Sequence, residues 1–354
     1  MLEAPQSLLY ERLDGGAVRC HICQWHCRIS PGRLGYCKTR RNDDGTLRTL
    51  IYGQVSSANV DPIEKKPLYH FHPGSRVFSL GTWGCNFRCI HCQNWSIAYA
   101  EANGEGWVVE GRRQAGGEML TAQQAVQMAL STRSAGLAWT YNEPAIWLEY
   151  TLDCARLAKE RGLYTVYVTN GYLSSEGLDV IGPYLDAYRV DIKGFSDDAY
   201  YKLARLPRGK GLQGILAVTE RARKKWGMHV EAVTNVIPGL NDGEAELRAL
   251  AAWLKDHLGP ETPWHVTRFF PQARLTDRSP TSLASLQRAR QIGLECGLHF
   301  VYLGNVADGE GSNTYCPGCG SLAVHRSGYG ARLVGLAPGG TCKACGASLN
   351  MRGV

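Results

Sequence analysis

The sequence lacks long hydrophobic runs, and none of its apolar segments reaches the ~18 residues that a membrane-spanning helix needs. Residues 1–14 are acidic and lack the basic and apolar segments of a secretory signal. Internal repeats and low-complexity tracts are also absent. With 354 residues, 44% hydrophobic and 20% charged, the composition is typical of a globular protein. We therefore expect a cytoplasmic protein without membrane contact, built as one large α/β domain with small appendages.

Disulfides are not expected either, because the cytoplasm is reducing. The 13 cysteines therefore indicate metal sites. Cys154 and Cys296 stand alone within helical apolar stripes and are predicted to be core residues. The others form three tight groups: an N-terminal group of Cys20, Cys23, Cys27 and Cys37, a central group of Cys85, Cys89 and Cys92, and a C-terminal group of Cys316, Cys319, Cys342 and Cys345.

The formal net charge of +7 would suit a nucleic-acid partner. Metal thiolates weaken that interpretation. Two zinc sites with four thiolates each and a cubane with three thiolates would lower the net charge to about +2. The basic run at residues 221–225 is therefore interpreted as a solvated helix face, and no nucleic-acid partner is expected.

From about residue 77 onward, short β-branched or aromatic runs alternate with helical patterns, as in βα units. Thr121 and Gln124 predict a capping box, and Pro144 and Gly162 mark the two ends of the next helix. Six or seven parallel units predict a full or partial TIM-type barrel, with a doubly wound open sheet as the competing topology. The predicted strands cover residues 77–82, 137–141, 164–169, 187–192, 229–236, 264–270 and 299–304; residues 101–118 form a Gly-rich, irregular insertion, and later helices cover 243–256 and 281–296.

The central cysteine group lies in GCNFRCIHCQNW with the spacing C-x3-C-x2-C, so one loop can turn each thiolate toward a different iron of a cubane. Four cysteines saturate an ordinary [4Fe-4S] cluster, so three would leave one iron open for a substrate. The alternative is a zinc site with His91 as fourth ligand. Polar residues farther along the chain favour the cluster.

These polar residues follow the predicted strands at the end where a TIM-type barrel carries its active site. Any single one could be a helix cap or a solvated loop residue, but the whole set converges on one face and indicates an active site. Its members are Asn142 and Glu143, Asn170 and Gly171, Asp191 and Lys193, Thr234 and Asn235, and Arg268.

The two outer cysteine groups predict further metals. The C-terminal group consists of two CxxC knuckles, each followed by glycine, which predict tetrahedral Zn²⁺, with rubredoxin-type iron as the alternative. The N-terminal group predicts either Zn²⁺ or an auxiliary iron-sulfur cluster. We expect three parts: a Cys-rich module with a linker at residues 1–74, a barrel at residues 75–305, and a zinc-ribbon or rubredoxin-like lobe at residues 306–354.

Longer motifs carry a family resemblance. GTWGCNFRCIHCQNW, TYNEP, VTNGY, VDIKG and VIPG resemble the core of radical S-adenosylmethionine (SAM) enzymes of the activating-enzyme type, in the same order. CHICQWHCRISPGRLGYC, DPIEKKPLYHFHPGS, RFFPQ and NTYCPGCG resemble more closely the radical SAM enzymes of the AmmeMemoRadiSam system, over nearly the whole chain. The resemblance implies a partial (β/α)6 barrel, a [4Fe-4S] cluster on Cys85, Cys89 and Cys92 whose open iron binds SAM, and a 5′-deoxyadenosyl radical as oxidant.

The resemblance also implies roles in SAM binding. Glu143, with Asn142, would accept the methionyl ammonium group in a charge-assisted contact. Asp191 and Lys193 would face the ribose and the carboxylate of SAM, and Asn170 would lie beside the nucleoside.

Three functions follow as hypotheses. The leading one is a radical SAM enzyme of the AmmeMemoRadiSam type that acts on a small molecule or a partner protein, with Memo-type proteins among the candidate partners. The second is an activating enzyme for a glycyl-radical enzyme. For both, a flavodoxin or ferredoxin is the expected electron donor. The third is a non-enzymatic metalloprotein whose clusters carry electrons or hold the fold.

Overall fold

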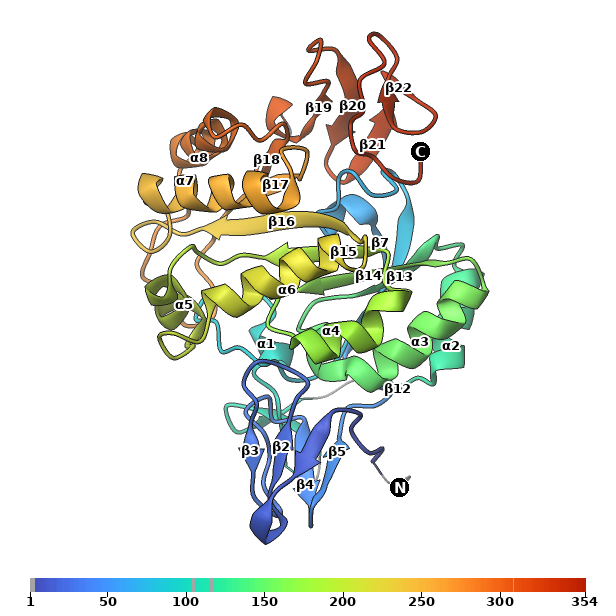
Figure 1. Ribbon diagram of the computed structural model, residues 1–354, viewed down its shortest axis with the longest axis vertical. Coiled ribbons are helices and arrows are strands. Elements are labelled where there is room, and N and C mark those ends of the chain that lie inside the picture. Colours follow the sequence, from blue (N-terminus) through green and yellow to red (C-terminus); the bar gives the residue numbers. More distant parts are fainter. Residues whose placement is uncertain (1–3, 104–105, 115–116, 308) are drawn as a thin grey trace.

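The computed structural model describes residues 4–103, 106–114, 117–307 and 309–354. Within these residues an eight-stranded sheet forms the centre, and the N-terminal module and the C-terminal lobe lie at opposite ends of the molecule (Figure 1). In spatial order the strands are β7 (Ser57–Pro62), β8 (Arg76–Gly81), β13 (Gly136–Trp139), β14 (Tyr164–Thr169), β15 (Ala187–Asp191), β16 (His229–Val236), β17 (Trp264–Arg268) and β18 (Val301–Gly304).

The strand order of this sheet equals the chain order, and every pair from β8 to β18 is parallel. Right-handed crossovers that always step in one direction place their helices on the same face of the sheet. A doubly wound sheet would instead reverse its order and carry helices on both faces. The prediction of an α/β partial barrel is therefore confirmed, and the strand order excludes the competing topology.

Strand β7 was not predicted, because its sequence SANVDP is rich in residues that strands disfavour. It forms on the free edge of β8, where all six residues pair in antiparallel register from Ser57 opposite Gly81 to Pro62 opposite Arg76. Pro62 fits because it stands at the end of an edge strand. The segment expected to be a linker thus joins the central sheet.

The helices follow the predicted caps. The backbone N–H of Gln124 donates to Thr121 Oγ1 at 3.1 Å, and Thr121 N–H donates to Gln124 Oε1 at 2.8 Å, so the capping box is confirmed. The helices are α1 (Trp95–Ala98), α2 (Ala122–Ser131), α3 (Leu148–Glu160), α4 (Ser175–Ile181), α5 (Asp197–Ala204), α6 (Leu212–Lys224), α7 (Glu244–Trp253) and α8 (Leu283–Glu295). Shorter 3-10 or π turns cover Asp14–Gly16, Ile63–Lys65, Pro144–Trp147, Gly182–Tyr184, Leu254–Leu258 and Glu310–Ser312.

The N-terminal module is made of short antiparallel strands: β1 (Tyr10–Arg12), β2 (Val18–Cys20), β3 (Arg28–Ile29), β4 (Arg40–Asp43), β5 (Thr46–Thr49) and β6 (Gln54–Val55). A buried ion pair joins the module to α3, because Arg40 donates to both carboxylate oxygens of Glu149 at 2.8 and 2.7 Å. The insertion predicted to be irregular contains the short strands β9 (Glu101–Ala102), β10 (Trp107–Val109), β11 (Arg112–Arg113) and β12 (Glu118–Met119).

The C-terminal lobe contains β19 (Thr314–Tyr315), β20 (Leu322–Ser327), β21 (Gly330–Leu333), β22 (Leu336–Ala337) and β23 (Thr341–Cys342). It packs on the segment that follows β7, where Arg326 donates to the carbonyl of Tyr69 at 2.7 Å. The same segment is held to β16 by Glu231, whose buried carboxylate accepts from the backbone N–H groups of Tyr69 and His70 at 3.0 and 2.8 Å. This segment therefore connects the sheet and the C-terminal lobe.

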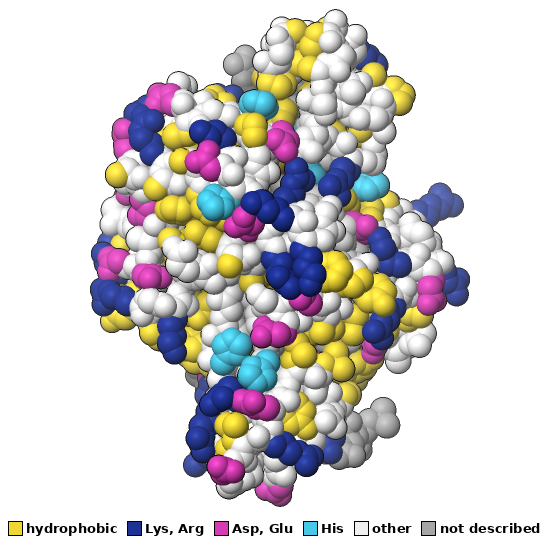
Figure 2. Space-filling view, in the orientation of Figure 1, with side chains coloured by type: hydrophobic (Ala, Val, Ile, Leu, Met, Phe, Trp, Pro, Cys, Tyr) yellow, Lys and Arg dark blue, Asp and Glu magenta, His cyan; other side chains and the backbone are white. Residues whose placement is uncertain are grey.

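The basic run at residues 221–225 lies at the end of α6, and its cations are paired. Arg221 and Lys225 contact Asp179, while Arg223 lies 2.9 Å from Glu261. On the face drawn in Figure 2, Lys and Arg side chains alternate with Asp and Glu. Among the described residues, no helix combines the length and the apolar character needed to cross a bilayer.

Candidate active site

A cavity of about 500 Å³ opens at the carboxyl ends of the parallel strands. Its walls come from the loops that follow these strands, from the segment after β7, and from the C-terminal lobe. This volume is in the usual range for a small-molecule site. The predicted barrel-site residues that line the cavity are Cys85, Cys89, Cys92, Asn142, Glu143, Asn170, Asp191, Lys193 and Asn235.

The loop after β8 carries the three central cysteines. Cys85 and Cys89 are buried, and Cys92 is partly exposed. Gly84, just before them, adopts a φ of +81°, which L side chains rarely adopt, and an added Cβ there would lie 2.5 Å from Thr39 Cγ2. Burial raises the pKa of each of the three thiols to about 12. Thiolates at this position therefore need a cationic partner.

The donor set fits an iron-sulfur cluster with one open position. Among the described residues that line the cavity, the only cysteines are Cys85, Cys89 and Cys92, so these would leave a fourth iron of a cubane free. His91 also lines the cavity, and burial lowers its pKa to about 3, so its ring is neutral. Its buried Nδ1 has no hydrogen-bond partner within the described part of the chain.

Asn142 fastens the cysteine loop to the end of β13. Its Oδ1 accepts from the backbone N–H of Thr82 at 3.1 Å, and its Nδ2 donates to the carbonyl of Gly84 at 2.7 Å. Both ends of the amide are therefore engaged by the backbone of the loop. This arrangement gives Asn142 a positioning role that its place in the sequence did not indicate.

Glu143 lies beside it with a fully buried carboxylate. The carboxylate accepts from the N–H of Ala145 at 2.9 Å, from the hydroxyl of Thr169 at 2.7 Å and from the N–H of Asn170 at 2.7 Å. Burial raises the pKa of Glu143 to about 7, although these hydrogen bonds oppose the shift. A bound cation would favour the charged form of this group.

Asp191 ends β15 between two cations, Arg189 and Lys193, and all three line the cavity. Burial would raise the pKa of Asp191, but Arg189 and Lys193 outweigh it, and the pKa is lowered. Burial would lower the pKa of Lys193, but Asp191, together with weaker contributions from Cys89 and other neighbours, outweighs burial, and the pKa is raised. Asp191 and Lys193 are therefore both charged at neutral pH.

A second charged group, of which Lys65, Lys66 and Tyr141 line the cavity, was only partly visible in the sequence. Asp61 on β7 accepts from Lys66 Nζ and from the hydroxyl of Tyr141, each at 2.6 Å, and from Lys65 Nζ at 2.9 Å. Burial lowers the pKa of Lys66 to about 8, and its ammonium lies 4.8 Å from the centre of the Tyr141 ring. The two adjacent lysines in DPIEKKP were visible in the sequence, but Asp61 and Tyr141 meet only in the fold.

Of the remaining predicted residues of this face, some line the cavity and others do not. Asn235 lines the cavity, whereas Thr234 is buried and donates to the carbonyl of Ile192. Arg268 donates to the carbonyl of Thr281 and is not among the described lining residues. Tyr329, in the turn between β20 and β21, lines the cavity from the C-terminal lobe, a contact that sequence distance concealed.

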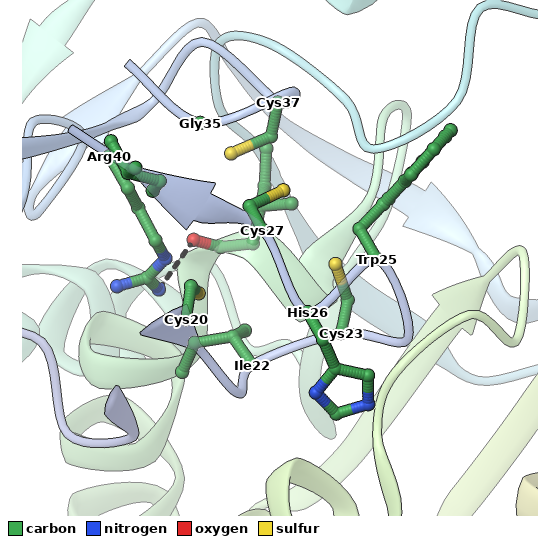
Figure 3. A pocket seen from close by; sticks show the side chains of 11 residues that line it. Cys20, Ile22, Cys23, Trp25, His26, Cys27, Gly35, Cys37 and Arg40 are labelled. Atoms are coloured by element: carbon green, nitrogen blue, oxygen red, sulfur yellow. Dashed lines mark hydrogen bonds between the residues drawn. The ribbon is translucent and has the colours of Figure 1, made fainter. Parts of the chain in front are cut away.

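The N-terminal cysteine group surrounds its own small cavity, with Arg40 beside it (Figure 3). Its members lie in three segments, around β2, before β3 and before β4. Burial raises the pKa of Cys20 to about 12 and the pKa of Cys23 well above its usual range. Such buried thiols fit a metal site.

The C-terminal cysteine group is compact. The sulfur atoms of Cys316, Cys319, Cys342 and Cys345 all lie within 4.8 Å of one another. Cys316 and Cys342 are buried, while Cys319 and Cys345 are exposed. Four sulfurs at this spacing can hold one tetrahedral metal ion.

The fold and the cavity define an α/β enzyme whose site combines a three-cysteine loop with charged side chains at the ends of parallel strands. Residues 80–251 match the family model of the radical SAM superfamily, so the chain contains a radical SAM domain. The prediction of a radical SAM enzyme is confirmed, and the non-enzymatic alternative is dropped.

Several proteins are similar to this chain. An uncharacterized protein of Methanocaldococcus jannaschii is 39% identical over 347 residues, which cover 98% of this chain and 99% of that protein. The pyruvate formate-lyase-activating enzyme of Clostridium pasteurianum is 27% identical over 49% of this chain and 67% of its own length. The isethionate sulfite-lyase activating enzyme of Desulfovibrio desulfuricans is 28% identical over 58% of this chain and 66% of its own length. The crystal structure of a radical SAM methyltransferase from Sphaerobacter thermophilus matches 64% of this chain and 66% of that chain, with 18% identity and a TM-score of 0.46.

We predict that Asp61→Asn strongly destabilises the protein, because it leaves the buried ammonium of Lys66 without its carboxylate. Breaking one side of a buried ion pair typically costs about 3–5 kcal/mol. The free energy of unfolding, measured in urea at pH 7, should fall accordingly. The loss should shrink between pH 7 and pH 9, because the lowered pKa of Lys66 makes the folded wild type lose this charge over the same range.

The exposed Asp198, which pairs with Lys202 and Arg208, provides the control, and Asp198→Asn should change the free energy by less than about 1 kcal/mol. In Asp61→Asn/Lys66→Met much of the stability should return, because no buried charge is left alone. Purely additive effects of the two substitutions would show that Asp61 and Lys66 do not stabilise each other.

Proposed function

We propose that the cavity binds SAM at a [4Fe-4S] cluster held by Cys85, Cys89 and Cys92. The observation that carries this proposal is the presence of three thiols, two of them buried, on one loop that lines a cavity of about 500 Å³. When bound, such a cluster reductively cleaves SAM to a 5′-deoxyadenosyl radical that abstracts hydrogen from the substrate. The chain positions SAM and the substrate and shields both from water.

The charged side chains of the wall are assigned to SAM. Glu143 would accept the methionyl ammonium group, and its nearly neutral pKa would then shift downward. Lys193 would bind the carboxylate and Asp191 the ribose hydroxyls, while Asn170 would lie beside the nucleoside. Asn142 would act by holding the cysteine loop against β13.

Lining residues that are not assigned to SAM, among them Lys66, Tyr141, Asn235 and Tyr329, would contact the substrate. The leading candidate is a cytoplasmic enzyme of the AmmeMemoRadiSam type, supported by the motifs that span the chain, with a small molecule or a partner protein as substrate and Memo-type proteins as candidate partners. A second candidate is the activation of a glycyl-radical enzyme, which the names of two relatives favour. One 5′-deoxyadenosine per partner chain, together with a glycyl radical in that partner, would identify the second.

The outer parts of the chain would serve this reaction. We propose Zn²⁺ rather than rubredoxin-type iron at the C-terminal group, because closed four-thiolate sites most often hold structural zinc. The N-terminal group would hold zinc or an iron-sulfur cluster. A flavodoxin or ferredoxin would supply the electron. The working division of the chain is a module at residues 1–74, a barrel at 75–305 and a lobe at 306–354.

The first prediction from this proposal concerns the cluster. Anaerobically prepared and reduced wild-type protein should show a [4Fe-4S]⁺ EPR signal that changes when SAM is added, because SAM would bind the open iron. The change and the formation of 5′-deoxyadenosine should both vanish when Cys85, Cys89 and Cys92 are replaced by Ala. Cys154→Ala, which alters a buried core cysteine away from the cavity, is the control. A SAM response that persists in the triple variant would refute the assignment.

The second prediction concerns the carboxylates. Glu143→Gln and Asp191→Asn should weaken SAM binding, because a lost charge-assisted contact costs ~1.5–3 kcal/mol, roughly tenfold to over a hundredfold in affinity. Asp186→Asn alters a carboxylate just before β15, at the opposite end of that strand from Asp191, and should leave the affinity unchanged. Calorimetric titration of protein with the cluster in place measures the affinities. Equal affinity in all variants would mean that these carboxylates do not contact SAM.

The third prediction concerns the C-terminal metal. Cys319→Ser/Cys345→Ser removes the two exposed thiols of the group and should lower the zinc content by about one atom per chain. The iron content and the SAM response of the EPR signal should stay as in the wild type. Loss of iron instead of zinc, with a rubredoxin-like visible spectrum in the parent, would show that the site holds iron.

A further inference from the structure

The sulfur atoms of the N-terminal cysteine group are less closely spaced than those of the C-terminal group. Zn²⁺ with four thiolates requires sulfurs close to one another, as in the C-terminal group, where all lie within 4.8 Å. Among the described residues, the N-terminal sulfurs do not form a group of that compactness. They surround a cavity of about 10 Å³, near the space that one water molecule needs. A site closed on one ion would leave no such space.

Donors to sulfur surround this cavity. The hydroxyl of Thr39 lies 3.1 Å from Cys37 Sγ. Arg40 is buried beside the cavity, and its terminal nitrogens are engaged by Glu149, Ser7 and the carbonyl of Ile146. Its Nε is buried and has no hydrogen-bond partner within the described part of the chain. A thiolate or sulfide would provide the acceptor that Arg40 Nε lacks, and hydrogen bonds to sulfur are a known means of setting a cluster potential.

The same module packs directly on the loop of the catalytic cysteines. Trp25 Nε1 donates to the carbonyl of Asn86, next to Cys85, at 2.8 Å. The Trp25 ring stacks on Tyr36 with 4.0 Å between ring centres, and the carbonyl of Tyr36 accepts from Arg88 at 3.2 Å.

The loops themselves are also in close contact. An added Cβ on Gly84 would lie 2.9 Å from the carbonyl oxygen of Cys37, so the chain just before Cys85 runs against the last cysteine of the N-terminal group. Hydrogen bonds and stacked rings therefore connect the two cysteine sites without intervening solvent-exposed chain.

We propose that Cys20, Cys23, Cys27 and Cys37 hold a [4Fe-4S] cluster that relays electrons to the cluster of the Cys85 loop. This inference rests on the proposed function. A flavodoxin- or ferredoxin-type protein gives up one electron and is oxidised, and the N-terminal cluster passes from the 2+ to the 1+ state. It then returns to 2+ as the catalytic cluster gains that electron, so no bond or proton changes. Cys27, the least buried member, marks the side from which the donor approaches.

The test compares the full-length wild type with Cys20→Ser/Cys23→Ser, both reconstituted without oxygen. The wild type should contain about eight irons and eight sulfides per chain, and the variant about half of each. The variant should keep the EPR signal that responds to SAM. When reduced flavodoxin is the donor and samples are frozen at successive times, that signal should develop several-fold more slowly in the variant. Cys296→Ser, a partly exposed cysteine at the end of α8, is the control and should match the wild type.

A second variant separates the relay from the folding of the module. Trp25→Phe removes the hydrogen bond to Asn86 but keeps all eleven grouped cysteines, so it should retain the full iron content while the catalytic cluster is reduced more slowly.

The inference would be overturned by wild-type protein with about four irons and two zincs, one of which is lost in Cys20→Ser/Cys23→Ser. Equal rates of reduction in the wild type and both variants would also overturn it. Failure of the proposed function is distinguishable, because the SAM-responsive signal would then be absent from the wild type itself.

Discussion

Desolvation of sulfur is the constraint on which the organisation of this molecule depends. Burial raises the pKa of Cys20, Cys85 and Cys89 to about 12, so these thiolates are stable only beside a cation. Neighbouring cationic side chains are already committed, Arg40 to Glu149 and Lys193 to Asp191. Arg88 also lowers the pKa of Cys85 and Cys89, but burial outweighs it. A metal would supply the further positive charge that the thiolates need, and the surrounding strands and loops hold the sulfurs in position for it.

The segment between β7 and β8 also supports the cysteine site, because it covers the inner face of the sheet. Glu231 would be costly to bury alone, but it accepts two backbone N–H groups of this segment and lies 2.9 and 2.7 Å from the Nε2 atoms of His229 and His265. Its pKa is lowered well below the usual range, because these partners outweigh burial. A charged residue in the sheet thus fixes the segment that brings Lys65 and Lys66 to the cavity.

Local signals in the sequence predicted most of the barrel, whereas contacts between distant segments could not be predicted. Runs such as YTVYVT carry strong strand preferences, and β14 has the predicted bounds. The polar strand β7 depends on the edge of β8, which no local pattern encodes. The site divides in the same way: Glu143 and Asp191 follow their own strands, but Asp61 meets Tyr141 across 80 residues of chain. The position of Asn142 in the sequence identified it as a candidate site residue, but its hydrogen bonds to the cysteine loop are visible only in the fold.

The C-terminal lobe is part of the cavity wall and not only an appended metal module. Tyr329 lines the cavity, as does Tyr69, whose ring lies 4.1 Å from the guanidinium carbon of Arg326. Arg326 is buried on β20, between the two cysteine knuckles in the sequence, and donates to Tyr69 O and to Thr314 Oγ1. A metal bound by the two knuckles would therefore also hold β20 in place. Through the contacts of Arg326, β20 would in turn hold Tyr69 in place. The lobe can in this way shape the cavity, although none of its four cysteines is among the described lining residues.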